Sequence, residues 1–391
     1  MNNKRVNILI IGGGFAGVEC ARVLAKSSEV SVTLISVEKH MEYYPAAFRV
    51  FSSQETDLAQ IPLEDIVPDN IRVVIDSVSR VDVGGRRVVC ASGVEYSCDY
   101  LVLAAGSQSA YYNIPGVSEY AFPFRGSVDV LRIREHIDDL FMKCATSTPD
   151  EQLVAFRFVV VGGGPAGCEI SAGIAHYAHD RAHKLNIPHD VVSVVLLEGR
   201  DRILSMFSPR FSEAVSHRLR ELGVQIMPYR RLMENKPWSA ILQDVQMGTR
   251  TVVWTAGVES ATVVRNIELP KSQKGRLVVD NHLAIPEHPC VYALGDIAET
   301  PGSGLAQTAI HDGAFVARDI LVRISGGVRK EYTPASVSHI VPLNRWSGVV
   351  SVQGIVLAGW VGWVARAFAD TMYLASRVGL IKTLHRILKS L

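Results

Sequence analysis

Two glycine-rich segments of the chain have the spacing of a phosphate-binding loop. Gly12, Gly14 and Gly17 form the pattern G-x-G-x-x-G. In such a loop the first glycine permits a tight turn, the second lets the backbone approach a pyrophosphate, and the third lets a helix pack on a strand. The anion then lies at the N-terminus of the helix, where unpaired N–H groups attract negative charge. The same pattern returns later in the chain at Gly162, Gly164 and Gly167.

The residues around each loop predict a strand before it and a helix after it. Residues 7–21 read NILIIGGGFAGVECA, and residues 157–171 read RFVVVGGGPAGCEIS. A second apolar strand follows each helix, at residues 30–35 and 191–197. Strand, helix and strand in this order form a βαβ unit with parallel strands. The sequence therefore predicts an α/β protein with two Rossmann-like dinucleotide-binding domains.

A carboxylate at the end of the second strand is expected to hold the adenosine ribose. Glu198 has this position in the second unit, and it favours the free 2′-hydroxyl of NADH. Arg200 and Arg202 follow closely, and their positive charges would tolerate the 2′-phosphate of NADPH. In the first unit Ser36 occupies the expected position and the nearest acid is Glu38, so the contact to the first ribose is left open.

Composition and charge exclude several classes of protein. The chain has 391 residues, 48% hydrophobic and 20% charged, with a formal net charge of +1. These values do not fit a disordered chain, a small disulfide scaffold or a nucleic-acid binder with a basic excess. The six cysteines show no C-x-x-C, C-x4-C or metal-ligand spacing, which predicts reduced thiols and no metal site. No apolar run reaches the roughly 18 residues of a membrane-spanning helix, so we expect any membrane contact to be peripheral.

These motifs resemble those of the type II NADH:quinone oxidoreductases, a branch of the FAD-dependent pyridine nucleotide oxidoreductases. The chain is also similar to the ferroptosis-suppressor or apoptosis-inducing-factor-like quinone reductases. The resemblance covers essentially the whole chain. It implies a glutathione-reductase-like flavoprotein fold in which the first loop binds FAD and the second binds NADH. It also implies a respiratory-chain activity that passes two electrons from NADH to a membrane quinone without proton pumping.

The resemblance extends to shorter motifs. The AAG segment at residues 104–106 resembles a segment beside the flavin, and WTAG at 254–257 resembles the equivalent turn of the NADH domain. LGD at 294–296 resembles the motif whose Asp holds the ribityl chain, and Arg49 resembles a basic residue of a loop beside the isoalloxazine. An Asp that caps the following helix would give the same pattern. The expected cofactor-binding residues are Gly12, Gly14, Phe15, Ala16, Gly17, Glu38, Arg49, Ala105, Gly106, Gly162, Gly164, Pro165, Ala166, Gly167, Glu198, Gly257, Gly295 and Asp296.

Two residues are expected to be catalytic on the same resemblance. Gln307 lies in AQTAIH, at residues 306–311, which resembles the quinone-site motif, with His311 where glutamine is usual. Glu169 matches a glutamate near the nicotinamide–flavin stack. The alternatives are ordinary polar residues on a helix for Gln307 and His311, and favourable interaction with the helix dipole for Glu169.

The C-terminal segment has the pattern of an amphipathic helix. Trp360 and Trp363 precede it, and Lys382, Arg386 and Lys389 lie on its polar side. This composition predicts a helix that lies in anionic headgroups, and the alternative is a core or dimer helix with a solvated basic face. The apolar positions within one arc are Leu380, Ile381, Leu384, Ile387, Leu388 and Leu391.

The expected organisation is a discontinuous FAD-binding domain, a NADH-binding domain and a C-terminal membrane-association and quinone-site segment. We place them at residues 1–117 with 287–333, at 118–286, and at 334–391, respectively. The expected location is the cytoplasmic face of a bacterial plasma membrane or, alternatively, the mitochondrial inner membrane, and a homodimer is left open. Rival functions are a sulfide:quinone oxidoreductase, which would need a redox cysteine pair, and a soluble reductase with a protein acceptor.

Overall fold

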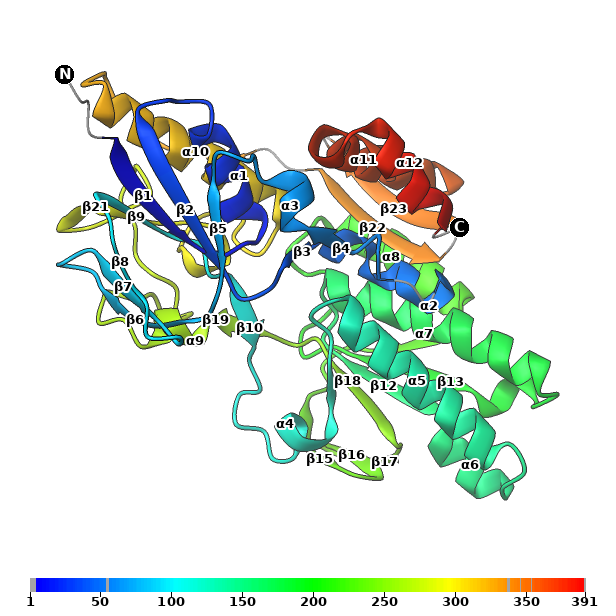
Figure 1. Ribbon diagram of the computed structural model, residues 1–391. Coiled ribbons are helices and arrows are strands. Elements are labelled where there is room, and N and C mark those ends of the chain that lie inside the picture. The colour runs from blue at the N-terminus through cyan, green and yellow to red at the C-terminus, as the bar shows by residue number, and fades with distance from the viewer. Residues whose placement is uncertain (1–4, 54–55, 336–337, 345, 353, 390–391) are drawn as a thin grey trace. The chain divides into compact units, whose positions relative to one another are not determined.

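The computed structural model describes residues 5–53, 56–335, 338–344, 346–352 and 354–389 (Figure 1). The chain forms two compact units, each built from three separate segments. Unit 1 comprises Met1–Glu42, Gln60–Gln108 and Val258–Val337, and unit 2 comprises Tyr43–Ala59, Ser109–Gly257 and Ser338–Leu391.

Unit 1 contains a six-stranded sheet in the order β20-β21-β9-β1-β2-β5. All neighbouring strands run parallel except β20, which pairs antiparallel with β21. Helices α1 and α10 lie side by side on this sheet (Figure 1). Alternate residues of the first strand point to opposite faces: Ile10 lies near Gly17 of α1, while Leu9 and Ile11 join the core on the other face. The bounds are β1 Val6–Ile11, β2 Val30–Ser36, β5 Arg72–Ile75, β9 Tyr100–Leu103, β20 Ala284–Ile285, β21 His288–Ala293, α1 Phe15–Leu24 and α10 Ala306–Ile324.

Unit 2 contains a five-stranded parallel sheet in the order β11-β18-β12-β13-β14. Phe158 and Val160 pack in one cluster with residues of the helices α5, α7 and α8. Val159 and Val161 pack in another cluster with a small sheet of three strands, β15 (Leu232–Lys236), β16 (Ser239–Leu242) and β17 (Gln246–Gly248). The bounds are β11 Phe122–Pro123, β12 Arg157–Val161, β13 Ser193–Leu197, β14 Val224–Met227, β18 Thr251–Trp254, α5 Ser127–Cys144, α7 Pro165–Lys184 and α8 Pro209–Glu221. The predicted pair of parallel Rossmann-like sheets is confirmed.

The C-terminal segment of unit 2 begins with a three-stranded antiparallel sheet that the sequence did not predict. Its strands are β22 (His339–Asn344), β23 (Ser347–Val352) and β24 (Ile355–Gly359). Gly359, with φ +83°, ends β24, and helices α11 (Trp360–Val378) and α12 (Leu380–Lys389) follow. The long apolar run from Gly354 is thereby divided between a strand and a helix. Among the described residues, none of the helices combines the length and the apolar composition that a membrane-spanning segment requires.

Helix α11 lies directly on the backbone of β23. A Cβ atom on Gly362 would come within 2.2 Å of the Gly348 carbonyl oxygen, so position 362 needs glycine. Val341, Leu343 and Val349 extend the main core of unit 2, the cluster around α5, α7 and α8, under this sheet. The tail is therefore an integral layer of unit 2.

The packed units have boundaries different from the expected domain limits. Residues 43–59 belong to unit 2, because Ala47, Val50 and Phe51 pack in its core with α5 and α7. Residues 258–286 belong to unit 1, because Val264 and Leu277 pack in its core. The remaining elements are β3 His40–Glu42, η1 Tyr44–Arg49, α2 Val50–Ser53, β4 Gln60–Pro62, α3 Leu63–Ile66, β6 Val78–Asp82, β7 Arg87–Cys90, β8 Glu95–Ser97, β10 Ser107–Ser109, α4 Val117–Tyr120, α6 Pro149–Ala155, η2 His189–Val191, β15 Leu232–Lys236, β16 Ser239–Leu242, β17 Gln246–Gly248, β19 Val258–Ser260, α9 Thr262–Arg265 and η3 Gly295–Ile297.

Candidate functional site

The first glycine loop connects β1 to α1 at the carboxyl edge of the sheet in unit 1. Gly12 has φ +117°, and a Cβ atom there would lie 2.1 Å from the Ala104 carbonyl oxygen. A Cβ atom on Gly17 would lie 1.9 Å from the Gly12 carbonyl oxygen. A Cβ atom on Gly14, in contrast, would meet nothing within 4 Å. The outer glycines are thus needed for turn and packing, while the middle one leaves an open approach to the N-terminus of α1, where Phe15 and Ala16 are largely buried.

The Asp296 turn lies at the same edge of the sheet, because β21 ends two strands away from β1. Gly295 adopts φ +71°, and its Cβ position would lie 3.4 Å from the Ala16 side chain of α1. The Ser107 hydroxyl donates a 2.5 Å hydrogen bond to Asp296 Oδ2. Because β9 lies between β1 and β21, the expected Ala105 and Gly106 segment follows the strand between these two loops.

The first ribose position holds Ser36 rather than an acid. A Cβ atom on Gly13 would lie 2.4 Å from the Ser36 hydroxyl oxygen, and that hydroxyl donates to the Glu38 carbonyl oxygen at 2.8 Å. Glu38 itself is exposed, two residues beyond the end of β2. The role of Glu38 in holding a ribose stays a prediction.

The second loop, between β12 and α7 of unit 2, repeats this geometry. Gly162 has φ +111°, and a Cβ atom on Gly167 would lie 1.8 Å from its carbonyl oxygen. A Cβ atom on Gly164 would meet nothing within 4 Å. Pro165 opens the helix, where its missing N–H is no loss, and Ala166 follows with a partly exposed side chain. The structure therefore provides a second helix N-terminus with an open backbone approach.

Glu198 occupies the predicted ribose position of this second loop. Its Oε2 accepts the Gly163 N–H at 2.8 Å, and its Oε1 accepts the Arg200 N–H at 2.8 Å. A carboxylate oxygen accepts more than one hydrogen bond, so both oxygens retain capacity for ribose hydroxyls. Arg202 donates to the carbonyl oxygens of Leu204, Ser205 and Phe207 and so stabilises the following loop.

Gly257 follows the end of β18 in the same unit. A Cβ atom there would lie 2.1 Å from the hydroxyl of Tyr112, so the phenol covers this glycine. Tyr112 has φ +50°, a left-handed conformation that few non-glycine residues adopt. The aromatic ring of Trp254 lies edge-on to Tyr112, with centroids 6.4 Å apart.

Glu169, in the second turn of α7, lies beside a buried ionic cluster. Burial raises the pKa of Glu169 to about 7, with the Arg366 guanidinium opposing this rise and the Asp370 carboxylate adding to it. Arg366 and Asp370 form an ion pair of 2.9 Å on the buried face of α11. The Glu169 carboxyl is therefore poised to exchange a proton near neutral pH.

Asp370 is the centre of this cluster. It accepts the Tyr43 hydroxyl at 2.7 Å and pairs with Arg49 at 3.1 Å. Burial lowers the pKa of Arg49, and the Asp370 carboxylate opposes that shift. Arg366 also donates to the Pro45 carbonyl oxygen, and the rings of Tyr43 and Tyr373 stack with centroids 5.1 Å apart.

The sequence patterns identified Arg49 and Glu169 but missed Tyr43, Arg366 and Asp370 as their partners. The sequence did contain a signal for Arg366 and Asp370: a basic and an acidic residue at positions i and i+4 within an apolar segment. Residues at this spacing lie next to each other on one face of a helix.

Gln307 and His311 lie one turn apart on α10 in unit 1. The Gln307 side chain is exposed in the first turn of the helix. His311 Nε2 forms a 2.9 Å hydrogen bond with the Thr333 carbonyl oxygen, and its ring contacts Tyr332. The alternative interpretation of His311 as a histidine whose hydrogen-bonding capacity is used within the fold therefore fits its contacts.

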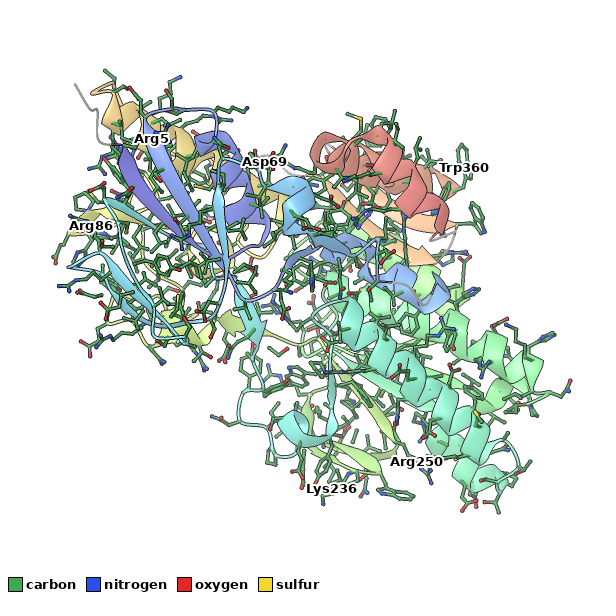
Figure 2. All side chains as sticks on the ribbon, viewed as in Figure 1. Arg5, Asp69, Arg86, Lys236, Arg250 and Trp360 are labelled. Carbon is green, nitrogen blue, oxygen red and sulfur yellow. The ribbon has the colours of Figure 1, made fainter. Side chains whose placement is uncertain are left out.

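Helices α11 and α12 expose apolar side chains. Trp360, Phe368 and Met372 are 70%, 65% and 58% exposed on α11, and Figure 2 shows Trp360 projecting outward from the start of the helix. Leu380, Ile381 and Leu384 are exposed on α12, while Thr383 is buried and Arg386 donates to the Asp57 carbonyl oxygen. Of the predicted apolar arc, the side chains of Ile387 and Leu388 and the whole of Leu391 lie outside the described residues.

The cysteines and metal-ligating side chains show no further site. All six cysteines are free, and burial raises the pKa of Cys20 and of Cys168. Within the ranges that the structure describes, no three His, Cys, Asp or Glu side chains are arranged to hold a metal ion.

The sequence and the fold of this chain are similar to those of known proteins. Residues 6–313 match the profile of the pyridine nucleotide-disulphide oxidoreductases. A type II NADH:quinone oxidoreductase of Mycobacterium tuberculosis is 26% identical over 97% of this chain and 87% of its own length. The NDH2 of Plasmodium falciparum, solved with NADH, superposes with a TM-score of 0.88 at 16% identity, covering 99% of this chain and 98% of that one. The sulfide:quinone oxidoreductase of Aquifex aeolicus superposes with a TM-score of 0.80 at 16% identity, covering 95% and 91%. Both structures share this fold.

Proposed function

This chain belongs to the pyridine nucleotide-disulphide oxidoreductase family, and we propose that it is a type II NADH:quinone oxidoreductase. In this activity the enzyme takes a hydride from NADH and passes two electrons to a membrane quinone without pumping protons. The observation that carries the proposal is the pair of glycine loops, one in each unit, each open only at its middle glycine, Gly14 or Gly164. The nearly full-length similarity to a type II enzyme supports it.

In this proposal unit 1 holds FAD. The residues present fit the group: the open face at Gly14 admits a pyrophosphate to the α1 N-terminus, and Asp296 has the acceptor chemistry for ribityl hydroxyls. When bound, FAD supplies the chemistry of hydride acceptance and electron transfer, which no side chain of this chain can supply. Ser107 donates to Asp296 and so keeps its carboxylate oriented.

Unit 2 holds NADH in this proposal. The second glycine loop binds the pyrophosphate, and Glu198 accepts hydrogen bonds from the adenosine ribose. A 2′-phosphate in the same place would lie against the Glu198 carboxylate, and like charges repel. The two backbone N–H groups that hold this carboxylate keep it at the ribose position. We therefore expect a preference for NADH over NADPH.

Glu169 is assigned the exchange of a proton. A hydride carries two electrons and one proton, so reduction of a quinone to a quinol with NADH consumes one further proton. A carboxyl group with a pKa of about 7 holds that proton at neutral pH and releases it readily. Burial is the main cause of this pKa, and Arg366 and Asp370 of α11 lower and raise it, respectively. Gln307 is assigned a hydrogen bond to a quinone carbonyl.

Helices α11 and α12 form the membrane-docking surface in this proposal. The side chains of Trp360, Phe368 and Met372 lie outward on one face of α11, while Arg366 and Asp370 lie buried on the other. An apolar face beside basic residues such as Lys382 suits the interface of an anionic bilayer. The protein would then work as a peripheral enzyme at the cytoplasmic face of a bacterial plasma membrane or at the mitochondrial inner membrane.

An anaerobic absorbance titration tests the function. NADH should bleach the flavin absorbance of the purified protein, and a short-chain quinone should restore it promptly. If NADH bleaches the flavin and quinone does not restore it, the assignment of the acceptor is wrong. Bleaching by sulfide in place of NADH would instead identify a sulfide:quinone oxidoreductase.

A further inference from the structure

A buried carboxylate lies under the turn that carries Asp296. Asp312, on α10, is 0% exposed, and its Oδ2 accepts the Gly295 N–H at 3.1 Å. Its Oδ1 accepts the hydroxyl of Tyr332 at 2.6 Å. Gly295 has a φ of +71°, a left-handed conformation that favours glycine. Asp296 is the next residue, so the hydrogen bond to Gly295 holds the turn that carries it.

The same turn of α10 also contacts the first glycine loop. A Cβ atom on Gly313, next to Asp312, would lie 2.3 Å from the Ala16 carbonyl oxygen at the start of α1. Residues 312 and 313 therefore support both parts of the site assigned to FAD: the helix N-terminus and the Asp296 turn.

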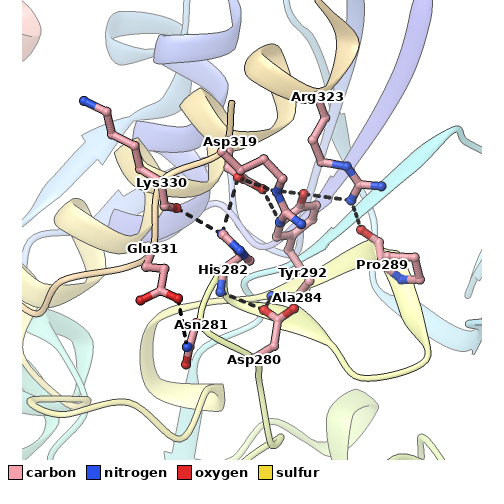
Figure 3. A network of polar contacts seen from close by, with 11 residues as sticks. Asp280, Asn281, His282, Ala284, Pro289, Tyr292, Asp319, Arg323, Lys330 and Glu331 are labelled. Atoms are coloured by element: carbon pink, nitrogen blue, oxygen red, sulfur yellow. Dashed lines mark hydrogen bonds and ion pairs between the residues drawn. The ribbon is translucent and has the colours of Figure 1, made fainter. Parts of the chain in front are cut away.

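Tyr332 is held in place by a short segment, Arg329–Thr333, that contacts Asn281 and His282, shortly before β20. Arg329 forms a two-pronged ion pair with Asp319, at 2.9 and 2.7 Å. The Lys330 carbonyl oxygen is 3.0 Å from His282 Nδ1, and the Tyr332 N–H donates to the Asn281 carbonyl oxygen at 2.7 Å. Figure 3 shows the contacts of Asp319 and the contact between Lys330 and His282. The Tyr332 hydroxyl thus comes from an anchored backbone.

We propose that Asp312 and Tyr332 are a positioning pair that fixes the Asp296 turn and thereby sets how tightly the chain holds FAD. The inference rests on the proposed function, in which unit 1 binds this cofactor. Without the Tyr332 hydroxyl, the buried Asp312 carboxylate loses a strong hydrogen bond and turns toward other donors. The Gly295 N–H then loses its fixed acceptor, and Asp296 loses the orientation that ribityl hydroxyls require.

Electrostatics agree with this arrangement. Burial raises the pKa of Asp312, and the nearby Asp296 carboxylate also raises it, while the hydrogen bond from Tyr332 and the one from Gly295 lower it. The two donors therefore oppose the effect of burial on the Asp312 carboxylate. A neutral residue at 312 would accept fewer hydrogen bonds from the same turn.

The test compares FAD binding by two matched variants. Full-length protein is stripped of flavin and titrated with FAD, and binding is followed by quenching of flavin fluorescence. Tyr332→Phe should raise the dissociation constant about tenfold, the effect of losing one charge-assisted hydrogen bond. Tyr177→Phe is the control, because the buried Tyr177 hydroxyl also donates to a carboxylate, Asp138, at 2.7 Å, but in unit 2.

Both variants should lower the melting temperature of the flavin-free protein similarly, and only Tyr332→Phe should weaken the binding of FAD. Asp312→Asn provides a second route, since an amide cannot accept from both donors with the same strength, and it should also raise the dissociation constant. A Tyr332→Phe protein that binds FAD within twofold of wild type overturns the inference, as does an equal effect of Tyr177→Phe. Wild-type protein that binds no FAD overturns the proposed function instead.

Discussion

The carboxylate of Asp370 and the hydroxyl of Tyr43 lie 2.7 Å apart, although 327 residues separate them in the chain. This contact joins the segment before η1 to the helix that also exposes Trp360 and Phe368. Burial raises the pKa of Tyr43, and Asp370 adds to this shift, so the phenol stays protonated and donates to the carboxylate. One helix of unit 2 thus presents an ionic face to the interior and an apolar face to the outside.

The two open glycines predict a reciprocal pair of variants. A Cβ atom on Gly14 or Gly164 meets no protein atom within 4 Å, so Gly14→Ala and Gly164→Ala should leave the melting temperature of the flavin-free protein nearly unchanged. The added methyl group would instead block the approach of a pyrophosphate. Gly14→Ala should weaken FAD binding at least tenfold, and Gly164→Ala should raise the KM for NADH with FAD content retained. The reverse outcome would exchange the two cofactor assignments.

Replacing the ribose acid should change the nucleotide preference. Glu198→Ala removes the acceptor for the ribose hydroxyls and the repulsion of a 2′-phosphate. We expect kcat/KM for NADH to fall about tenfold, equivalent to one lost hydrogen bond to a charged group. The ratio of NADH to NADPH activity should fall as well. Asp201→Ala, at an exposed acid three residues later, is the control and should leave the ratio unchanged.

Glu169 should make the stability of the folded protein depend on pH. Its pKa is about 7 in the folded protein and near 4.5 in an unfolded chain. Between these values the folded state binds more protons, so ionisation destabilises it as the pH rises. Wild type should lose about 3 kcal/mol of unfolding free energy between pH 4.5 and pH 7.5 relative to Glu169→Gln. Denaturant unfolding of flavin-free protein at both pH values measures this, and parallel pH dependences would contradict it.

The protonation state of Glu169 should also affect the rate of quinone reduction. If Glu169 donates a proton, the rate of flavin reoxidation by quinone should fall as the pH rises through about 7. Glu169→Gln should be slower by about a hundredfold and lose this pH dependence. Asp370→Asn should move the fall to lower pH, because Asp370 raises the pKa of Glu169. Stopped-flow absorbance resolves this step from reduction by NADH.

The apolar face of α11 should determine membrane affinity. Phe368→Ala removes a side chain that is 65% exposed, and its loss should lower the liposome partition coefficient about tenfold. Met372→Ala should lower it several-fold. Met142→Ala is the matched control, since Met142 is 79% exposed on α5. Equal effects of the two methionine variants in flotation with anionic vesicles would contradict docking through α11.

Local patterns predicted the parts of the fold that depend on neighbouring residues. The strand predicted at residues 30–35 is β2 (Val30–Ser36), and the strand predicted at 191–197 is β13 (Ser193–Leu197), because β-branched apolar runs are strand signals. The turn at Gly12 and the packing at Gly17 also follow from spacing alone, since both requirements act within one loop and its helix.

The rest of the candidate site depends on contacts between distant segments. Nothing near Tyr43 in the sequence indicates that its hydroxyl meets Asp370, and nothing near Asp312 indicates Tyr332. The tail was predicted as a membrane-association segment with an amphipathic helix from Leu380, and its first part is the sheet β22–β24, which is stable because Val341 and Val349 join a core made by other segments. Such tertiary packing overrides local preference.

The facing glycines of α11 and β23 restrict how the tail can move. With Gly362 seated against Gly348, a rotation of α11 by one residue would bring a side chain into a space that has room for none. A slide along the strand would do the same. The helix is therefore fixed in its rotation and in its position along the strand. The outward orientation of Trp360 and Phe368 is a rigid property of unit 2 and does not depend on contact with lipid.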